Sequence, residues 1–553
     1  MSTTTLRLRW RGSFGPAVWL LLILALVAVV RIRLLSLPLE RDEGEYAYAG
    51  QFMLEGVPPY QLIYNMKLPG IYAAYALIMA VFGQSAQGIH LGFMLANFGA
   101  IVLIYFVGRR FLDRAAAVAA SAAYALLSID PHVQGLNAHA THFLVLAALG
   151  ATLVLLRAQE SGRRAGLFWS GALFGLAFLM KQPGGAFAMF GFSLLLWAAW
   201  RRPAPDWKTS VASLAVYSAG VAAPIVLTVL MIWHVGVWDR FWWWTMTYAR
   251  THATVLPWEF GKIRLAGFLA HLSWNGVFWG LALAGLAAVL MGKNRADEKF
   301  FFLSLLFFSA LAVCPTFHFT NHYFVLMLPV LALLAARAFV PAATWLAAQP
   351  LAVARGAPWI LFGLVWVGAA SSHFDLFALW GPPEAAARMY PSNDFQVYPI
   401  LADYLKSHTP ANATFAVLGS EPELLFYAHR RSVTGYIYMY DLVQTQPFRA
   451  RMAQDMISEV ERGRPDFVVF VNVVYSWLPY SHEDFDQIRN WFMEYTDSQY
   501  DPYGVVTFPP NVYVWGPDCL KRVPLGHRFV IIFQRKPAPL NARPPVKSNT
   551  TSL

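Results

Sequence analysis

The sequence predicts a polytopic α-helical membrane protein with a C-terminal α/β domain outside the membrane. Three observations predict it: long uncharged apolar stretches, short basic clusters between them, and a return of polar residues after residue 374. Hydrophobic residues make up 57% of the chain and charged residues only 13%, whereas soluble domains average about 25% charged residues. Mean hydropathy is +0.45. We attribute the net charge of +11 to membrane topology, and not to a nucleic-acid partner.

Because about 20 apolar residues cross a bilayer core as a helix, we expect about eleven transmembrane helices within residues 1–374. They are expected at 14–37, 87–108, 115–130, 138–156, 166–180, 184–200, 210–235, 265–291, 300–314, 323–340 and 357–374. The outer segment 38–86 is expected to hold two surface helices, at 46–56 and 70–84, the second interfacial or re-entrant. The proline-containing segment 338–354 is either interfacial or part of an additional hairpin.

The basic residues predict the orientation of these helices. They cluster on alternate loops, at 7–11, 109–114, 157–164, 201–208 and 293–299. By the positive-inside rule these loops and the N-terminus are cytoplasmic. Arg31 and Arg33 follow the first apolar run without a small-residue cleavage site, so we expect a retained helix and not a signal peptide. The opposite loops and the C-terminal domain then face outward.

The region after residue 374 reads as a separate α/β domain, at 375–535. Short β-rich runs occur at 415–419, 466–474, 511–515 and 528–533, and helical patterns at 396–408, 444–462 and 482–495. This length is sufficient for its own hydrophobic core. The Pro-rich tail, 536–553, is predicted to be disordered. Cys314 and Cys519 do not form the pattern of a disulfide framework.

Nearly all candidate chemistry falls on the outward loops. Asp42 and Glu43 are adjacent carboxylates after the first helix, and either one is a candidate general base, or both are ordinary solvated loop charges. Lys67 and Lys181 are isolated lysines beside proline and glycine. Such an ammonium either binds a lipid phosphate or is an interfacial anchor. We therefore select Asp42 and Glu43 as catalytic candidates, and Lys67 and Lys181 as phosphate-binding candidates.

Four histidines and a tyrosine are expected to line an outer cavity. They are His139, His142, His318, His322 and Tyr323. His318 and His322 have the i, i+4 spacing of a zinc pair. However, the sequence contains no HExxH motif. We therefore predict hydrogen bonding by these residues, and no metal site or other cofactor.

Four motifs occur in order between residues 40 and 340: RDEGEYAYAGQFMLEGVPPY, NMKLPGIYAAY, GALFGLAFLMKQPGG and NHYFVLMLPVLALLAA. Together they resemble the GT-C membrane glycosyltransferases of the protein O-mannosyltransferase and lipid A aminoarabinose transferase type (glycosyltransferase family 39 and relatives). The resemblance implies that Asp42 is the catalytic base and that Lys67 contacts the phosphate of a polyprenyl-phosphate sugar. The chain departs from the family at Glu45, where relatives often have Arg or Tyr. It also has His142 after Thr141, where many have an acidic residue.

We therefore expect a transferase that moves a sugar from a polyprenyl-phosphate donor to an unidentified acceptor (lipid, glycan or protein) on the outer face, and a single displacement of the lipid phosphate inverts the anomeric centre. We expect it in a bacterial inner membrane, in contact with membrane lipids. The motif LGSEPELLFYAHRRSVTGYIY resembles the outer domain of many bacterial relatives. Two alternatives remain: a lipid or polysaccharide transporter, and a non-catalytic envelope assembly subunit. Transporters place ionisable groups near the bilayer midplane, whereas here the predicted spans are nearly free of charge.

Overall fold

The computed structural model describes residues 15–201, 206–272, 275–293, 295–347, 356–478, 482–509, 511–526 and 528–537. The chain divides into two compact units, Met1–Pro399 and Ile400–Leu553. This division falls later than the predicted boundary at 375, because Arg33 donates to the carbonyls of Phe377 and Trp380 and so joins that segment to the first unit. The predicted tail lies outside the described residues from 538 onward.

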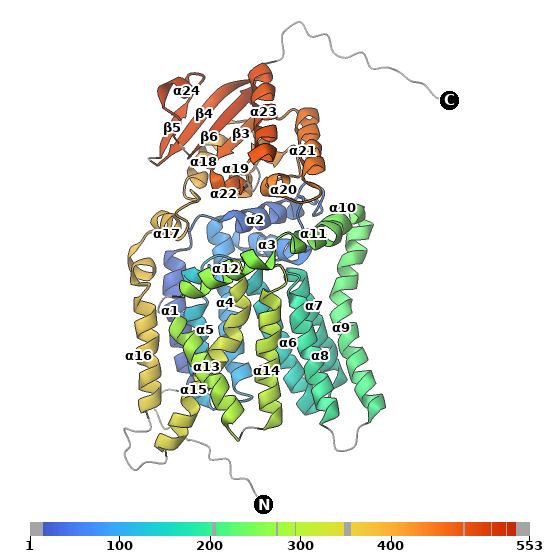
Figure 1. The fold of residues 1–553 in the computed structure, drawn as a ribbon, viewed down its shortest axis with the longest axis vertical. Coiled ribbons are helices and arrows are strands. Elements are labelled where there is room, and N and C mark those ends of the chain that lie inside the picture. Colours follow the sequence, from blue (N-terminus) through green and yellow to red (C-terminus); the bar gives the residue numbers. More distant parts are fainter. Residues whose placement is uncertain are drawn as a thin grey trace, which may run out of the picture. The chain divides into compact units, whose positions relative to one another are not determined.

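The first unit is helical throughout (Figure 1). Its long helices are α1 (Pro16–Arg33), α4 (Ala86–Gly108), α5 (Arg114–Leu127), α6 (Ala140–Ser161), α7 (Arg164–Met180), α8 (Gly184–Trp200), α9 (Trp207–His234), α13 (Gly276–Met291), α14 (Ala296–Val313), α15 (Leu328–Ala347) and α16 (Ala357–Ser371). Its shorter elements are α2 (Arg41–Leu54), α3 (Pro69–Phe82), η1 (Pro131–Val133), α10 (Trp238–Trp242), η2 (Trp243–Tyr248), α11 (Ala249–Thr254), α12 (Trp258–Ala270), η4 (Asn321–Met327), η6 (Asp375–Leu379) and α17 (Pro382–Met389). Figure 1 shows α2, α3 and α10 to α12 at one end of the bundle of long helices.

Several of these helices are apolar enough to cross a membrane. Among the described residues, five have the length and composition for a span: Pro16–Arg33, Ala86–Gly108, Ala140–Ser161, Trp207–His234 and Asn321–Leu346. Six shorter helices, α3, α5, α7, α8, α13 and α16, are also apolar. The exposed faces of these longer and shorter helices carry large apolar side chains such as Leu21, Leu227 and Leu364, as expected for contact with lipid.

Each predicted span contains a helix, but the span expected at 265–291 is interrupted. Helix α12 ends at Ala270 and α13 begins at Gly276. Between them, the buried Asn275 donates from Nδ2 to Asp130 Oδ2 at 2.7 Å. Apolar periodicity runs through both helices and gave no sign of this polar contact, which depends on a residue far away in the sequence.

Small residues allow the long helices to pack closely. A Cβ added to Gly171 of α7 would lie 2.2 Å from the carbonyl oxygen of Tyr217 in α9. A side chain at this position would force the two helices apart, and membrane helices commonly use small residues at such crossings. Helix α7 also packs against α6 and α8. The loop that follows α7 carries Lys181, so this packing fixes where the lysine emerges.

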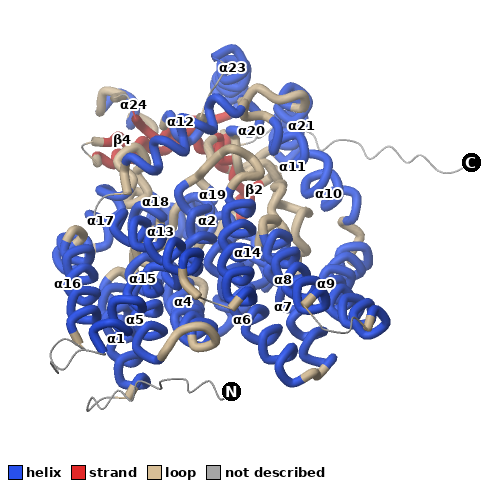
Figure 2. Tube along the Cα trace, turned by 60° about the horizontal axis from the view of Figure 1, so that its bottom comes forward, coloured by secondary structure: helices blue, strands red, loops and turns tan. Residues whose placement is uncertain are grey.

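The second unit is an α/β fold with one mixed sheet, coloured red in Figure 2. Its strands are β1 (Thr414–Leu418), β2 (Arg431–Ser432), β3 (Phe467–Asn472), β4 (Tyr500–Phe508), β5 (Val512–Trp515) and β6 (Arg528–Arg535), in the order β2-β1-β3-β6-β4-β5. Its helices are α18 (Tyr398–His408), α19 (Pro422–Ala428), α20 (Tyr440–Val443), α21 (Arg449–Gly463), α22 (Val474–Trp477), α23 (His482–Gln499) and α24 (Cys519–Arg522). Strand β1 is parallel to β2 and β3, and the remaining pairs are antiparallel.

The predicted β-rich runs contain β1, β3, β5 and β6, whereas β2 and β4 were not predicted. Strand β4 begins with Tyr500, Asp501 and Pro502, and Asp and Pro are residue types typical of turns. The ladder with β6 shifts register between Pro502 and Gly504. Strand β4 therefore forms because it pairs with a distant strand, although its own sequence has only a weak preference for β structure.

Candidate functional site

The site is built around the first turn of α2. Glu40 precedes the helix and accepts a hydrogen bond from the backbone N–H of Glu43 at 2.9 Å, while the Glu43 carboxylate accepts from the backbone N–H of Glu40 at 3.2 Å. This reciprocal capping box satisfies two N–H groups that the helix itself leaves open. Asp42 lies between these two residues in the chain. The cap therefore starts the helix at Arg41 and sets the direction in which Asp42 projects.

Lys67 pairs with two carboxylates of α2. Its Nζ donates to Asp42 Oδ1 at 2.7 Å and to Glu45 Oε2 at 2.5 Å. Glu45 is fully buried and also accepts from Asn65 at 3.1 Å and Tyr72 at 2.5 Å. Because relatives often have Arg or Tyr at this position, Glu45 was doubtful as a phosphate contact. In the structure it instead supports the lysine.

Electrostatics keep both members of the Asp42–Lys67 pair charged. Burial raises the pKa of Asp42, but the neighbouring basic groups, Lys67 first and then His322, His139 and Lys181, together lower it by more, and the net pKa lies well below its usual range. Burial lowers the pKa of Lys67, but Asp42 and Glu45 raise it by more, so the net pKa lies above its usual range. The pair is therefore a carboxylate and an ammonium at neutral pH.

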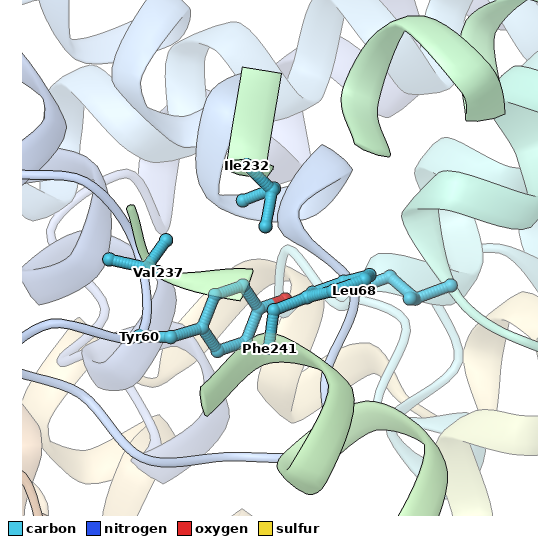
Figure 3. Packing of buried hydrophobic residues seen from close by; sticks show 5 residues of the cluster. All are labelled: Tyr60, Leu68, Ile232, Val237 and Phe241. Carbon is cyan, nitrogen blue, oxygen red and sulfur yellow. The ribbon is translucent and has the colours of Figure 1, made fainter. Parts of the chain in front are cut away.

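An apolar cluster holds the segment that carries Lys67. Tyr60, Leu68, Ile232, Val237 and Phe241 pack together (Figure 3). The hydroxyl of Tyr60 also donates to the carbonyl oxygen of Lys67 at 2.7 Å. The cluster joins the α2–α3 connection to the end of α9 and to α10, and so fixes the backbone on which the lysine side chain stands.

The segments of Lys67 and Lys181 are tied to each other. Gln182 donates from Nε2 to the carbonyl oxygen of Met66 at 2.7 Å. Gly70 is the second residue of α3, and a Cβ added there would lie 2.5 Å from the carbonyl oxygen of Leu179. The glycine therefore permits the start of α3 to approach the end of α7. This close approach brings the two predicted phosphate-binding lysines to the same region.

Lys181 contacts an aromatic ring and an imidazole. Its Nζ lies 4.1 Å from the centre of the Tyr323 ring, a distance typical of a cation–π contact. It also lies 3.1 Å from His322 Nε2, while His322 Nδ1 lies 3.1 Å from Gln134 Oε1. Burial lowers the pKa of Lys181 to about 7, although the charge of Asp42 opposes this. Unlike Lys67, this lysine changes its charge near neutral pH.

His139 precedes α6 and faces the carboxylates. Its Nδ1 lies 3.6 Å from Glu40 Oε1 and 3.8 Å from Asp42 Oδ2, and its ring stacks on that of His322 with centroids 4.1 Å apart. Only 1% of the residue is exposed, and neither ring nitrogen has a hydrogen-bond partner among the described residues. Burial lowers the pKa of His139 to about 4. The imidazole of His139 is therefore neutral at neutral pH and buried beside the carboxylates.

Asp42, His139 and His322 form a group of suitable type for a divalent metal, and their ligand atoms lie within 4.8 Å of one another. The observed rings do not converge on one ion. They are stacked with only 18° between their planes, and imidazole binds metal along its in-plane lone pair at about 2.0–2.1 Å. His322 Nε2 also faces Lys181. In this arrangement the three residues form two stacked imidazoles beside a carboxylate.

Glu43, the alternative catalytic candidate, is fully buried and engaged. Its carboxylate is hydrogen-bonded to Asn137 Nδ2 at 2.8 Å, to the backbone N–H of Ala138 at 2.6 Å and to His90 Nε2 at 3.1 Å. Burial raises the pKa of Glu43, but His90 and these hydrogen bonds lower it below its usual range. The geometry suits a residue that joins α2 to the start of α6 and to α4.

The other two predicted cavity residues, His318 and His142, make different contacts. His318 stacks on His252 with centroids 4.8 Å apart and is hydrogen-bonded through Nδ1 to the carbonyl of Thr316, so it does not pair with His322. His142 is buried against Phe93. Of the five predicted cavity residues, His139, His322 and Tyr323 gather around Lys181 and Asp42.

Sequence reasoning missed several residues of the site. They are Glu40, Asn65, Tyr72, His90, Gln134 and Asn137. Glu40 and Glu43 have the i, i+3 spacing of a capping box, which was a usable signal. The other residues are common types in apolar surroundings, and only their contacts across the fold distinguish them.

Sequence and structure comparisons agree on the kind of fold. Residues 67–233 match the family model described as dolichyl-phosphate-mannose-protein mannosyltransferase. No curated protein sequence matches the chain. Lys67 and Lys181 fall inside the matched range, whereas Asp42 lies before it.

Solved structures are similar along nearly the whole chain. ArnT from Cupriavidus metallidurans bound to undecaprenyl phosphate has 17% identity and a TM-score of 0.56, with 94% of this chain and 98% of that chain covered. The oligosaccharyltransferase of Archaeoglobus fulgidus in the apo form has 13% identity and a TM-score of 0.56, with 96% and 77% covered. At these identities the likeness shows the fold. The resemblance stated from the motifs is thus matched by the family model over residues 67–233 and by the fold of these solved structures.

Proposed function

We propose that this protein is a membrane glycosyltransferase that moves a sugar from a polyprenyl-phosphate donor to an acceptor on the outer face of the membrane. The observation that carries the proposal is the convergence of Asp42, Lys67 and Lys181 from α2, the α2–α3 connection and the end of α7. Two structures with the same fold were solved with a polyprenyl phosphate: ArnT with undecaprenyl phosphate, and the archaeal oligosaccharyltransferase AglB with dolichol-phosphate. A lipid donor of this class is consistent with both observations.

The two lysines are proposed to bind the donor phosphate. Each ammonium is placed by hydrogen-bonded neighbours and is only partly covered, and an ammonium–phosphate contact is charge-assisted. The leaving group gains negative charge as the bond from the anomeric carbon to the phosphate oxygen breaks. Lys67 and Lys181 would stabilise that charge without reorganisation, which is where preorganised cations contribute most.

Asp42 is proposed as the general base. It would accept the proton of the acceptor nucleophile, which attacks the anomeric carbon while the polyprenyl phosphate departs with the bonding electron pair. A single displacement of this kind inverts the anomeric centre. Before donor binding Lys67 holds Asp42 strongly acidic, which makes it a weak base. The donor's negative charge beside Lys67 would offset this effect and raise the basicity of Asp42 when substrate is present.

The orientation follows from the basic loops, and we propose that the N-terminus is cytoplasmic and the C-terminal α/β domain lies outside the cell membrane. The site then faces outward, as a donor in the outer leaflet requires. We further propose about eleven spans and a bacterial inner membrane location. Neither the transporter nor the assembly subunit requires a carboxylate with this arrangement of lysines, so the enzyme is the function we favour.

The test is transfer itself. Purified protein in lipid nanodiscs is incubated with a panel of undecaprenyl-phosphate sugars and an extract of cell-envelope acceptors, and free undecaprenyl phosphate is measured. The wild type is expected to release it in the presence of acceptor, and the Asp42→Asn variant is not. Mass spectrometry of envelope lipids, glycans and proteins with and without the protein then identifies the product. Accumulation of translocated but unmodified lipid would instead support a transporter and overturn the proposal.

A further inference from the structure

A chain of three polar side chains leads from the loop before α6 to Lys181. The amide oxygen of Gln134 faces His322 Nδ1 at 3.1 Å, and His322 Nε2 faces Lys181 Nζ at 3.1 Å. An amide oxygen accepts hydrogen bonds and an ammonium only donates them. The imidazole between them must therefore carry its proton on Nδ1 and present the lone pair of Nε2 to the lysine. Gln134 thereby sets the tautomer of His322.

The backbone at Gln134 is also unusual. Its φ is 55° and its ψ is 38°, a left-handed conformation that residues other than glycine and asparagine seldom adopt. The residue follows η1, and its N–H donates to the carbonyl of Pro131 at 3.0 Å. Strained backbone persists where the surroundings impose it, and it is concentrated at functional sites. In this conformation the amide oxygen of Gln134 lies within reach of His322 Nδ1.

The charged form of Lys181 needs stabilisation by its neighbours. Burial disfavours its charge and lowers its pKa to about 7. Four other groups surround this charge. The carboxylates of Asp42 and Glu40 favour the ammonium form and Lys67 opposes it. The Tyr323 ring, 4.1 Å away, makes a cation–π contact with the ammonium. A lone pair on His322 Nε2 favours the ammonium form, because it accepts a hydrogen bond that only the protonated amine donates well.

We propose that Gln134 and His322 are positioning residues that hold the ammonium of Lys181 toward the phosphate of the lipid donor. The inference rests on the proposed function for the identity of the ligand. Neither residue is proposed to touch the reacting atoms: Gln134 acts through His322, and His322 through Lys181. In this role the lone pair of His322 Nε2 accepts from Lys181, so Nε2 is not free to bind a metal while the lysine is in place.

The experiment uses the full-length protein in nanodiscs and undecaprenyl phosphate as the probe. Its dissociation constant is measured for Gln134→Leu, His322→Phe, the double variant and Lys181→Ala. His318→Phe is the matched control, because His318 lies on the same segment but contacts His252 instead. We expect His322→Phe to weaken binding about ten-fold, the effect of one lost hydrogen bond to a charged group. Gln134→Leu should weaken it less, and His318→Phe should leave it unchanged.

Non-additivity distinguishes a chain from three independent contacts. If Gln134 acts only through His322, the double variant binds no more weakly than His322→Phe alone. Equal binding by His322→Phe and wild type would overturn the proposal. So would full additivity of Gln134→Leu and His322→Phe.

A second measurement needs no donor and so separates this proposal from the proposed function. The rate of Lys181 modification by an amine-selective reagent, followed by mass spectrometry across pH, reports the protonation of Lys181. Loss of either positioning residue should make Lys181 reactive at a lower pH than in wild type, since the ammonium form has lost its acceptor. An unchanged profile in both variants refutes the chain. If instead the profile shifts but Lys181→Ala still binds the probe normally, the chain stands and the donor site is wrong.

Discussion

Asp42 and Glu43 are neighbours in the sequence, and the structure predicts opposite consequences for neutralising them. Asp42→Asn removes the proposed base while keeping the size of the side chain. Loss of a general base costs about 10²–10⁴ in rate, or about 3–5 kcal/mol in the barrier. Lys67 keeps Glu45 as a partner at 2.5 Å, so we expect only about 1–2 kcal/mol of destabilisation.

Glu43→Gln should instead destabilise the fold. One carboxylate oxygen contacts His90 and the N–H of Ala138, and the other contacts Asn137 and the N–H of Glu40. Three of these four groups are donors: the N–H of Ala138, the N–H of Glu40 and Asn137 Nδ2. Whichever way the glutamine amide is turned, its NH₂ group faces two of the four groups and cannot accept from the donors among them. Each buried donor left without an acceptor costs about 1–3 kcal/mol, so the cost is about 1–3 kcal/mol when the NH₂ group faces His90 and Ala138 and about 2–6 kcal/mol when it faces Asn137 and Glu40. The residual rate per folded molecule should remain near that of wild type.

The assay measures release of undecaprenyl phosphate per folded molecule, with thermal unfolding followed on the same samples. We expect Asp42→Asn to be inactive and stable, and Glu43→Gln to be active and unstable. Near-normal turnover by Asp42→Asn would refute the assignment of the base. A stable but inactive Glu43→Gln would move the base to Glu43, despite its four hydrogen bonds.

Three further predictions concern the donor site and the topology. Lys67→Ala should weaken undecaprenyl phosphate binding about 10-fold or more, and Lys67→Arg should restore part of it; unchanged affinity with lowered thermal stability would favour an anchoring role. Donor affinity should fall as pH rises through about 7, because the phosphate binds the protonated form of Lys181 and burial lowers its pKa to about 7; an affinity that is constant up to pH 9 would contradict this. Reporter fusions at residues 160 and 205 should read cytoplasmic and a fusion at 400 external, and an external signal at 205 would overturn the outward-facing site.

The local features of this fold were readable from the sequence, and the reason is periodicity. Apolar runs such as those of α4 and α6 identify membrane helices because the bilayer offers no other partner for the backbone. The interruption between α12 and α13 was missed, because the contact between Asn275 and Asp130 leaves no local pattern. Strand β4 was missed for the same reason, since its partners are supplied by distant strands.

The candidate site shows the same division. Short motifs in chain order made Asp42, Lys67 and Lys181 candidates, because turn-forming residues and isolated charges stand out in an apolar sequence. The surroundings of their neighbours depend on how helices pack: as adjacent carboxylates Glu43 and Asp42 are alike, and the contacts with His90 and Asn137 are what distinguish Glu43 as a buried, hydrogen-bonded residue. Likewise nothing near Gln134 in the sequence points to Lys181. Which polar groups meet is decided by packing between distant segments, and that packing exists only in the tertiary structure.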